Sequence, residues 1–293
     1  MKKVGIYGKS IAEPNFKFIN NLLDCIRNEM SPEIFLHKNL AYIPNLYKKG
    51  IDQLFDGDDL IYSNVDLLIS FGGDGTLLDT VTMIKDSNIP ILGINAGRLG
   101  FLANITQEDI VSAVKVLKDK KYRLDQRTLV EVDNYKDLNG IQCNFALNEI
   151  TIHKKDSSSM LSIQTYVDDE FLNTYWSDGL IVSTPTGSTA YSLSCGGPII
   201  SPGSDNLIIN PISPHNLNLR PVVVSDNVVI KLETQSREGQ FLLTMDSRSI
   251  TVENNVPIIL KKSDFTINLV ELPDQNFFKT IRNKLFWGKD SRN

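Results

Sequence analysis

Hydrophobic residues follow two different patterns along the chain, and the change falls near residue 125. In the first part, apolar runs lie at residues 4–7, 65–71 and 89–94. Segments with apolar residues at helical spacing alternate with these runs, at residues 16–26, 76–85 and 107–118. Short apolar runs predict buried parallel strands, and helical spacing predicts the helices that connect them. Strand–helix alternation of this kind indicates an open α/β sheet.

After residue 125 the pattern becomes that of an all-β domain. Short runs rich in β-branched residues are separated by turn residues such as Asp168-Asp169. The runs lie at residues 162–167, 222–224, 228–232 and 265–269. Closely spaced short strands with turn signals between them are typical of a sandwich.

Helical spacing returns at the C-terminal end, where one face would carry Phe277, Phe278, Ile281 and Leu285. We therefore predict three parts. They are a Rossmann-like open α/β domain over residues 1–125, a β-sandwich-type domain over residues 126–270, and a segment of residues 271–293 that packs back on the first domain.

Composition narrows the class of protein. The chain has 293 residues and a formal net charge of −5, which argues against nucleic acid as the main partner. No stretch approaches the roughly 18 apolar residues that span a bilayer, and the N-terminus does not resemble a signal peptide. Three cysteines and three histidines are scattered, so we expect neither a disulfide framework nor a metal-ligand cluster. We expect a cytoplasmic enzyme that binds no membrane.

The strongest local signal is a glycine loop between a predicted strand and a predicted helix. Its residues are Gly72, Gly73, Asp74, Gly75 and Thr76. Glycines allow a sharp turn and close approach of the backbone to a ligand. Free N–H groups at a helix start favour an anion such as a diphosphate, and open α/β sheets bind ligands at this edge. Thr76 and Asp79 also have the spacing of a capping box.

Asp74 is the unusual residue of this loop. A carboxylate about 4 Å from a phosphate is repelled by on the order of 1–4 kcal/mol. Its presence is explained if it takes a proton from an attacking hydroxyl or faces a metal ion, and both roles suit phosphoryl transfer. The residues alone leave the alternative open that the loop is a glycine turn with a solvated aspartate.

The sequence does not match two other nucleotide-binding patterns. Gly8-Lys9-Ser10 resembles the end of a Walker A loop, but Lys3 stands where that pattern requires glycine. No G-x-G-x-x-G follows a predicted strand, so a dinucleotide-binding redox enzyme loses its main support.

A second concentration of polar side chains covers residues 178–191. The segment reads as a strand and a turn dense in hydroxyls, with Gly187 for close approach and Tyr191 as an aromatic face. Cys195 fits a small buried residue better than a nucleophile. Upstream, Asn148-Glu149 interrupts an apolar run, where a polar pair is costly unless it has partners. The alternatives are a Ser/Thr-rich loop and an exposed strand end.

Together these segments resemble the NAD kinase family. The matches occur in the family's order, at residues 72–76, 95–102, 148–149, 178–191 and 214–221. The glycine–aspartate loop alone is shared with diacylglycerol-type lipid kinases and 6-phosphofructokinases. The hydroxyl-rich segment with the upstream Asn148-Glu149 is far more specific.

The resemblance implies ATP-dependent phosphorylation of the adenosine 2′-hydroxyl of NAD, giving NADP. Asp74 would be the general base, and the loop that meets the ATP phosphates would be Gly72, Gly73, Gly75 and Thr76. The implied NAD-binding residues are Asp74, Gly75, Phe101, Asn148, Glu149, Asp178, Thr189, Ala190, Tyr191, Ser194 and Asp246. The family also implies a homodimer or homotetramer and a divalent cation, Mg²⁺ carried with ATP. Polyphosphate stays open as a donor.

Two positions depart from the family. Ser247 follows Asp246 where many members have glycine, and Arg98 stands where histidine or asparagine is common. Two other functions remain as alternatives. A lipid kinase would share the glycine–aspartate loop, although no membrane-docking segment is visible. A non-catalytic NAD(P)-sensing module would have no need of Asp74.

Overall fold

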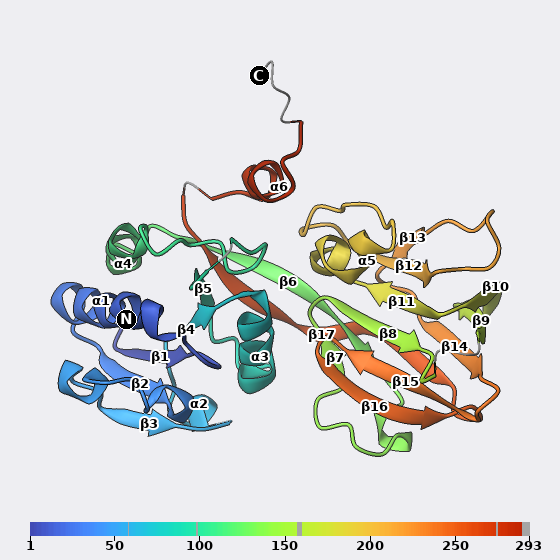
Figure 1. The fold of residues 1–293 in the computed structure, drawn as a ribbon, viewed down its shortest axis with the longest axis horizontal. Coiled ribbons are helices and arrows are strands. Elements are labelled where there is room, and N and C mark those ends of the chain that lie inside the picture. The colour runs from blue at the N-terminus through green and yellow to red at the C-terminus, as the bar shows by residue number, and fades with distance from the viewer. Residues whose placement is uncertain (58, 98, 157–159, 274, 289–293) are drawn as a thin grey trace. The chain divides into compact units, whose positions relative to one another are not determined.

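The computed structural model describes residues 1–57, 59–97, 99–156, 160–273 and 275–288. The chain divides into two compact units (Figure 1). Unit 1 comprises Met1–Gln126 and Ile267–Asn293, and unit 2 comprises Arg127–Thr266. Within the described residues, no helix is long and apolar enough to span a bilayer.

Unit 1 is built on a parallel sheet. Its strands are β1 (Lys3–Tyr7), β2 (Glu33–His37), β3 (Gln53–Phe55), β4 (Leu67–Gly72), β5 (Ile91–Asn95) and the end of β17 (Ile258–Glu271). Their spatial order is β17-β5-β4-β1-β2-β3. Because helices cover both faces of such a sheet, its central strands are largely apolar, as β4 is in Leu67–Phe71, where Ser70 alone is polar.

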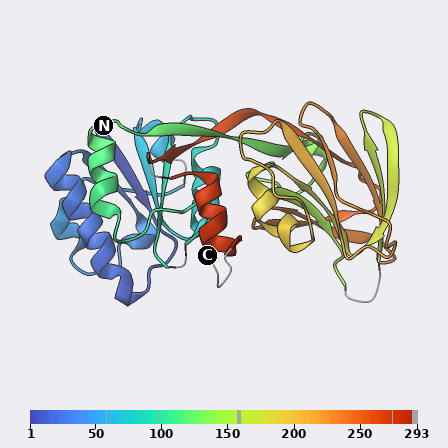
Figure 2. The same ribbon diagram turned by 90° about the horizontal axis from the view of Figure 1, so that it is seen from above.

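Helices cover the two faces of this sheet. They are α1 (Phe16–Glu29), α2 (Asp59–Tyr62), α3 (Asp74–Ile84) and α4 (Ile110–Lys118). Helices α1 and α4 lie side by side and share a core with Val4 and Ile6 of β1 (Figures 1 and 2). On the opposite face, Leu60 of α2 packs over Gly5 and Leu77 of α3 packs over Gly93.

This arrangement creates a topological switch point between β1 and β4, which pair in parallel. The chain leaves β1 toward α1 on one face and leaves β4 toward α3 on the other. The two connections therefore diverge at the carboxyl ends of the two strands. Open α/β sheets bind ligands in the crevice that such a divergence leaves.

The start of α3 corrects one expectation. The helix begins at Asp74 rather than at residue 76, Gly73 is its N-cap, and no side chain caps it. The capping box of Thr76 and Asp79 is therefore wrong. Thr76 lies inside the first turn and its side chain packs over Gly72, where a Cβ would stand 2.3 Å from the Thr76 hydroxyl. Glycine is needed at residue 72 for this close approach.

Unit 2 is β-rich. One sheet is antiparallel and has the order β13-β12-β11-β8-β15-β16. These strands are β8 (Glu149–His153), β11 (Gly179–Ser183), β12 (Asn206–Ile212), β13 (Val222–Ser225), β15 (Gln240–Met245) and β16 (Arg248–Glu253). The other strands of the unit are β7 (Phe145–Ala146), β9 (Leu161–Val167), β10 (Glu170–Ser177), β14 (Ile230–Gln235) and parts of β6 (Arg123–Val132) and β17.

Both sets of strands of unit 2 pack on one apolar core, to which β8, β9, β14 and β15 contribute Ile150, Ile163, Ile230 and Leu243. The expected fold class, an α/β domain followed by a β-rich domain, is confirmed. A short 3-10 helix (Thr186–Thr189) and α5 (Tyr191–Ser194) follow β11 and carry the hydroxyl-rich segment.

The last helix, α6 (Phe277–Leu285), belongs to unit 1. Ile281 is buried, and the Lys284 ammonium donates to the carbonyl of Leu99. The Asn276 side chain caps the helix by accepting the N–H of Lys279 at 2.8 Å.

We expect Asn276→Ala to lower the free energy of unfolding by about 0.5–2 kcal/mol, because it removes this N-cap. Asn276→Asp retains an acceptor oxygen and should stay close to the original stability. Urea denaturation of both variants measures the difference. Equal stability of Asn276→Ala and the unsubstituted chain would contradict a structural role for the cap.

Candidate functional site

The Asp74 carboxylate binds three consecutive backbone N–H groups of a segment that is distant in sequence. Oδ2 accepts from Phe101 at 2.9 Å, and Oδ1 accepts from Leu102 at 3.0 Å and from Ala103 at 2.9 Å. Gly100 makes room for this contact, because a Cβ there would stand 2.0 Å from Oδ1. Asp74 is therefore no solvated aspartate of a glycine turn, and that alternative is wrong.

The contact leaves the carboxylate partly available. A carboxylate offers about four acceptor positions, and the three amides occupy three of them. A ligand hydroxyl can donate to the remaining one. Because Asp74 opens α3, this position lies where the unpaired N–H groups of a first helical turn favour an anion.

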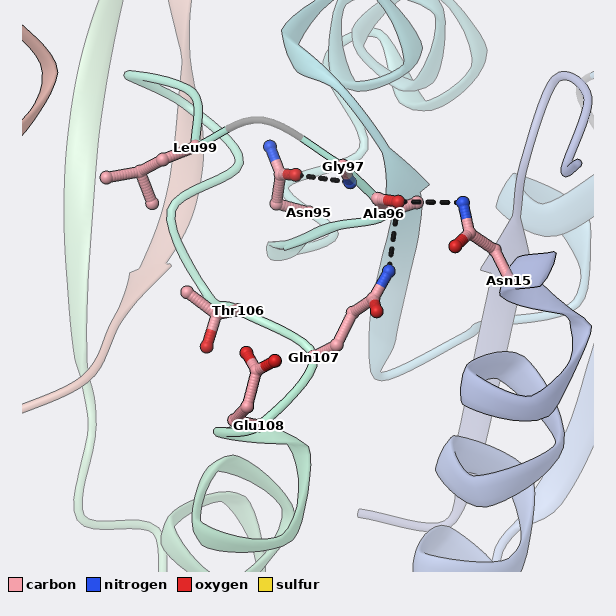
Figure 3. Close-up of a pocket in the computed structure, with 8 residues that line it drawn as sticks. All are labelled: Asn15, Asn95, Ala96, Gly97, Leu99, Thr106, Gln107 and Glu108. Carbon is pink, nitrogen blue, oxygen red and sulfur yellow. Dashed lines mark hydrogen bonds between the residues drawn. The ribbon is translucent and has the colours of Figure 1, made fainter.

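Asn95 stabilises the segment that reaches Asp74. Its side-chain Oδ1 accepts the N–H of Gly97 at 2.6 Å, and its Nδ2 donates to the carbonyl of Ala103 at 3.2 Å. The carbonyl of Ala96 accepts from Asn15 at 2.8 Å and from Gln107 at 2.9 Å (Figure 3). A pocket of about 360 Å³ is lined by the residues Asn15, Asn95 and Gln107, among others. Arg98, the departure noted in the sequence, lies outside the described residues.

In unit 2, a second aspartate repeats the arrangement of Asp74. The Asp246 carboxylate accepts the N–H groups of Leu147 at 2.9 Å, Asn148 at 2.9 Å and Glu149 at 3.3 Å. Asn148 and Glu149 are each only 8% exposed. The alternative of an exposed strand end is therefore wrong. The backbone does not require glycine at residue 247, where many family members have it. The positive φ of 51° falls on Asp246 and not on Ser247.

The Glu149 carboxyl is buried beside Asp246. Burial and the Asp246 charge raise the pKa of Glu149 to about 8, although a hydrogen bond from the Tyr191 N–H opposes them. Oε2 has no hydrogen-bond partner among the described residues. Burial also raises the pKa of Asp246, against its three amide bonds and the neighbouring Arg248. A buried acceptor without a partner is costly, which fits a position completed by a ligand.

The hydroxyl-rich segment packs tightly against Asn148. The Thr184 N–H donates to the Asn148 carbonyl at 2.9 Å, and a Cβ on Gly187 would stand 2.1 Å from the same oxygen. The hydroxyls largely stabilise the segment itself, since Ser188 donates to the Pro185 carbonyl at 2.6 Å and Thr189 to that of Thr186 at 3.2 Å. The segment is thus a tightly packed and internally hydrogen-bonded turn.

The negative charge of Asp178 acts on the hydroxyl of Tyr191. Burial is the main cause that raises the pKa of the Tyr191 hydroxyl. Cys195, Asp178 and Glu149 raise this pKa further. Lys154 forms an ion pair with Asp178 at 2.5 Å. No local pattern in the sequence marks Lys154, because its partner Asp178 lies far along the chain, between β10 and β11, and comes close only when β8 pairs with β11.

The buried pair and its neighbours collect at one end of the sheet, because β8 begins where β11 ends. Ser183 pairs with Glu149, and Asp246 follows directly after β15. Ala190 is the N-cap of α5 and Ser194 is its last residue, so both follow the hydroxyl-rich turn in the chain. No group of three or more His, Cys, Asp or Glu side chains arranged to hold a metal occurs in the described part of the chain.

An α/β unit with a glycine–aspartate loop at its switch point, followed in the chain by a β-rich unit with a buried polar site, defines a nucleotide-dependent phosphotransferase. Two family models match the chain: the ATP-NAD kinase N-terminal domain over residues 22–122 and the ATP-NAD kinase C-terminal domain over residues 147–272. The chain belongs to the ATP-NAD kinase family, whose members are phosphotransferases with an alcohol group as acceptor.

Individual relatives agree with this assignment. NAD kinase from Flavobacterium psychrophilum is 46% identical over 286 residues, which cover 95% of this chain and 93% of the relative. NAD kinase from Cytophaga hutchinsonii is 45% identical over 294 residues, with 98% and 99% covered. The crystal structure of yeast NADH kinase complexed with NADH superposes with a TM-score of 0.86 at 24% identity, covering 99% of this chain and 89% of that one. This likeness supports the fold.

We expect Gly100→Ala to lower the free energy of unfolding by about 1–3 kcal/mol, because the added Cβ overlaps the Asp74 carboxylate. Gly97→Ala in the same segment is the matched control, since a Cβ there meets nothing within 4 Å. Urea denaturation compares the two variants. If both are equally stable, the contact between Asp74 and residues 100–103 does not form.

We expect the contribution of Glu149 to the stability of the protein to fall between pH 4.5 and pH 8. In this window the folded chain holds a proton on Glu149 that the unfolded chain has released, so raising the pH favours unfolding. Glu149→Gln should make this fall shallower, and the exposed Glu253→Gln should leave it unchanged. Thermal unfolding at pH 5, 6, 7 and 8 tests the expectation. Parallel profiles for all three proteins would contradict it.

Proposed function

We propose that this chain transfers the γ-phosphoryl group of ATP directly to the adenosine 2′-hydroxyl of NAD, with Asp74 as the general base. The 2′-hydroxyl donates to the acceptor position that the three amides leave on Asp74. As the new bond from the 2′-oxygen to the γ-phosphorus forms, the hydroxyl proton passes to Asp74. The bond between the γ-phosphorus and the bridging oxygen of ADP breaks, so no covalent enzyme intermediate is needed. Positioning and charge neutralisation supply most of the catalysis in such transfers.

The observation that carries this proposal is the position of the Asp74 carboxylate. It stands at the start of α3 beside the switch point, fixed by three N–H groups and with one acceptor position left. In this proposal the donor phosphates lie along Gly72, Gly73, Gly75 and Thr76.

Each unit by itself holds residues that we propose to bind NAD. Unit 1 contributes Asp74, Gly75 and Phe101. From unit 2, the buried Asn148 and Glu149 offer an amide and an unpartnered carboxyl oxygen to the adenosine. The remaining residues of the proposed NAD site are Asp178, Thr189, Ala190, Tyr191, Ser194 and Asp246. Asp246 acts by positioning, because its carboxylate already accepts three N–H groups of residues 147–149.

Magnesium enters as part of the substrate MgATP. Mg²⁺ commonly retains waters and binds substrate phosphates with one or two carboxylates rather than a full protein cage. We further propose that the protein is cytoplasmic and forms a homodimer or homotetramer, with residues 1–125 and 271–293 as the donor domain and residues 126–270 as the NAD domain. Polyphosphate is a second donor to be tested.

The deciding experiment is NADP formation by the purified protein with ATP, Mg²⁺ and NAD, each omitted in turn. NADP in the complete mixture alone supports the proposal. Binding of NAD without NADP formation would favour a non-catalytic NAD(P)-sensing module. Phosphorylation of diacylglycerol but not NAD would favour the lipid-kinase alternative, which the family assignment already opposes.

We expect Asp74→Asn to lower kcat by roughly 10²–10⁴ while NAD binding is kept, if general base catalysis is the main role of Asp74. Asp86→Asn, at an exposed position just after α3, is the matched control and should keep full turnover. Because asparagine also replaces one acceptor oxygen by an NH₂ group, unfolding of both variants should be followed at the assay temperature. Full turnover by a folded Asp74→Asn variant would refute the assignment.

A further inference from the structure

The Gly8-Lys9-Ser10 segment, which fails the Walker A pattern, is placed by the fold directly beside the glycine–aspartate loop. It follows β1, and Tyr7 at the end of β1 pairs with Ser70 of β4. A Cβ on Gly8 would stand 2.9 Å from Leu40 Cδ2 and 3.1 Å from the Phe71 carbonyl oxygen. Glycine therefore lets this segment lie against the end of β4, one residue before the loop begins.

Lys9 points its charge toward α3. Its Nζ lies 3.3 Å from Asp79 Oδ2, five residues after the start of that helix. The same Asp79 oxygen accepts the hydroxyl of the buried Tyr7 at 3.1 Å. Asp79 is thus fixed by the end of β1. Lys9 remains 67% exposed, so its ammonium can leave Asp79 for a stronger anionic partner in the crevice.

A cation at the switch point would offset the repulsion between the ATP phosphates and Asp74. ATP brings several negative charges to a loop that already carries the Asp74 carboxylate, and both would repel each other. Backbone N–H groups and the helix dipole offset part of this repulsion. A lysine serves as a mobile point charge for phosphate, whereas a surface ion pair of Lys9 with Asp79 contributes little by itself.

We propose that Lys9 binds the phosphates of the ATP donor across the switch point from the glycine–aspartate loop, and that Asp79, itself held by Tyr7, keeps Lys9 beside the loop until ATP arrives. This inference rests on the proposed function. It adds a donor-binding residue that the loop motif does not contain. Since Lys9 comes from the β1 connection, the donor phosphates would be held from both sides of the crevice between β1 and β4.

The test is equilibrium binding of MgATP to the full chain by titration calorimetry, followed by KM values for ATP and for NAD. Lys9→Met should weaken MgATP binding roughly 10- to 100-fold, the size expected for loss of a hydrogen bond to a charged group. The KM for NAD should stay unchanged. Lys9→Arg should restore most of the ATP affinity.

Lys121→Met is the matched control. Lys121 is 71% exposed and pairs with Asp119 at 3.0 Å, but it follows α4, at the end of that helix away from the switch point. This variant removes the same charge and should bind MgATP like the unsubstituted chain.

Each outcome separates this inference from the proposed function. Unchanged ATP affinity in a folded Lys9→Met variant, or equal weakening of ATP and NAD, overturns the role of Lys9 even when the unsubstituted protein forms NADP. If the unsubstituted protein binds MgATP but forms no NADP, the proposed function fails while the binding comparison still decides the role of Lys9. Failure of the unsubstituted chain to bind MgATP overturns both.

Discussion

Each unit depends on the same kind of interaction: an aspartate carboxylate that accepts three consecutive backbone N–H groups of a distant segment. Asp74 fixes residues 101–103, and Asp246 fixes residues 147–149. Irregular backbone has few internal hydrogen bonds, and these carboxylates supply them. In both places a glycine permits close packing of the fixed segment, Gly100 against Asp74 and Gly187 against the Asn148 carbonyl. The backbone at Phe101 and at Asn148 is thereby fixed, although neither residue belongs to a helix or strand.

The two aspartates work under different electrostatic conditions. Asp74 stands at a helix start, where the dipole and unpaired N–H groups favour negative charge. Asp246 is buried next to Glu149, and burial together with mutual repulsion raises the pKa of Glu149 to about 8. Two neighbouring buried carboxyls titrate as a coupled pair, in which ionisation of one opposes ionisation of the other. Near neutral pH the buried Glu149 carboxyl therefore lowers the stability of unit 2, and it does so at the residues proposed to contact the adenosine.

Local patterns predicted most of the α/β elements, because apolar runs and helical spacing are properties of neighbouring residues. The strands β2 and β3 went unpredicted, since Glu33–His37 and Gln53–Phe55 have only five and three residues, too few for a hydrophobic period to stand out. The site motifs were visible as local clusters. Their connections were not, because Asp74 reaches Ala103 over 29 residues and Asp246 reaches Asn148 over 98. The same limit hid Lys154, whose ion pair exists only once β8 and β11 are adjacent.

A ligand can relieve the unfavourable burial of the Glu149 carboxyl. Its Oε2 lacks a partner among the described residues, and a buried carboxyl in that state favours its neutral form. Hydroxyl or amino donors of a nucleoside would supply the missing hydrogen bonds, and donation to the carboxylate favours the ionised form. Binding of such a ligand would then lower the pKa of Glu149 and release a proton at pH values below 8. Proton release coupled to NAD binding, and absent in Glu149→Gln, would connect the instability of the free site directly to recognition of the adenosine.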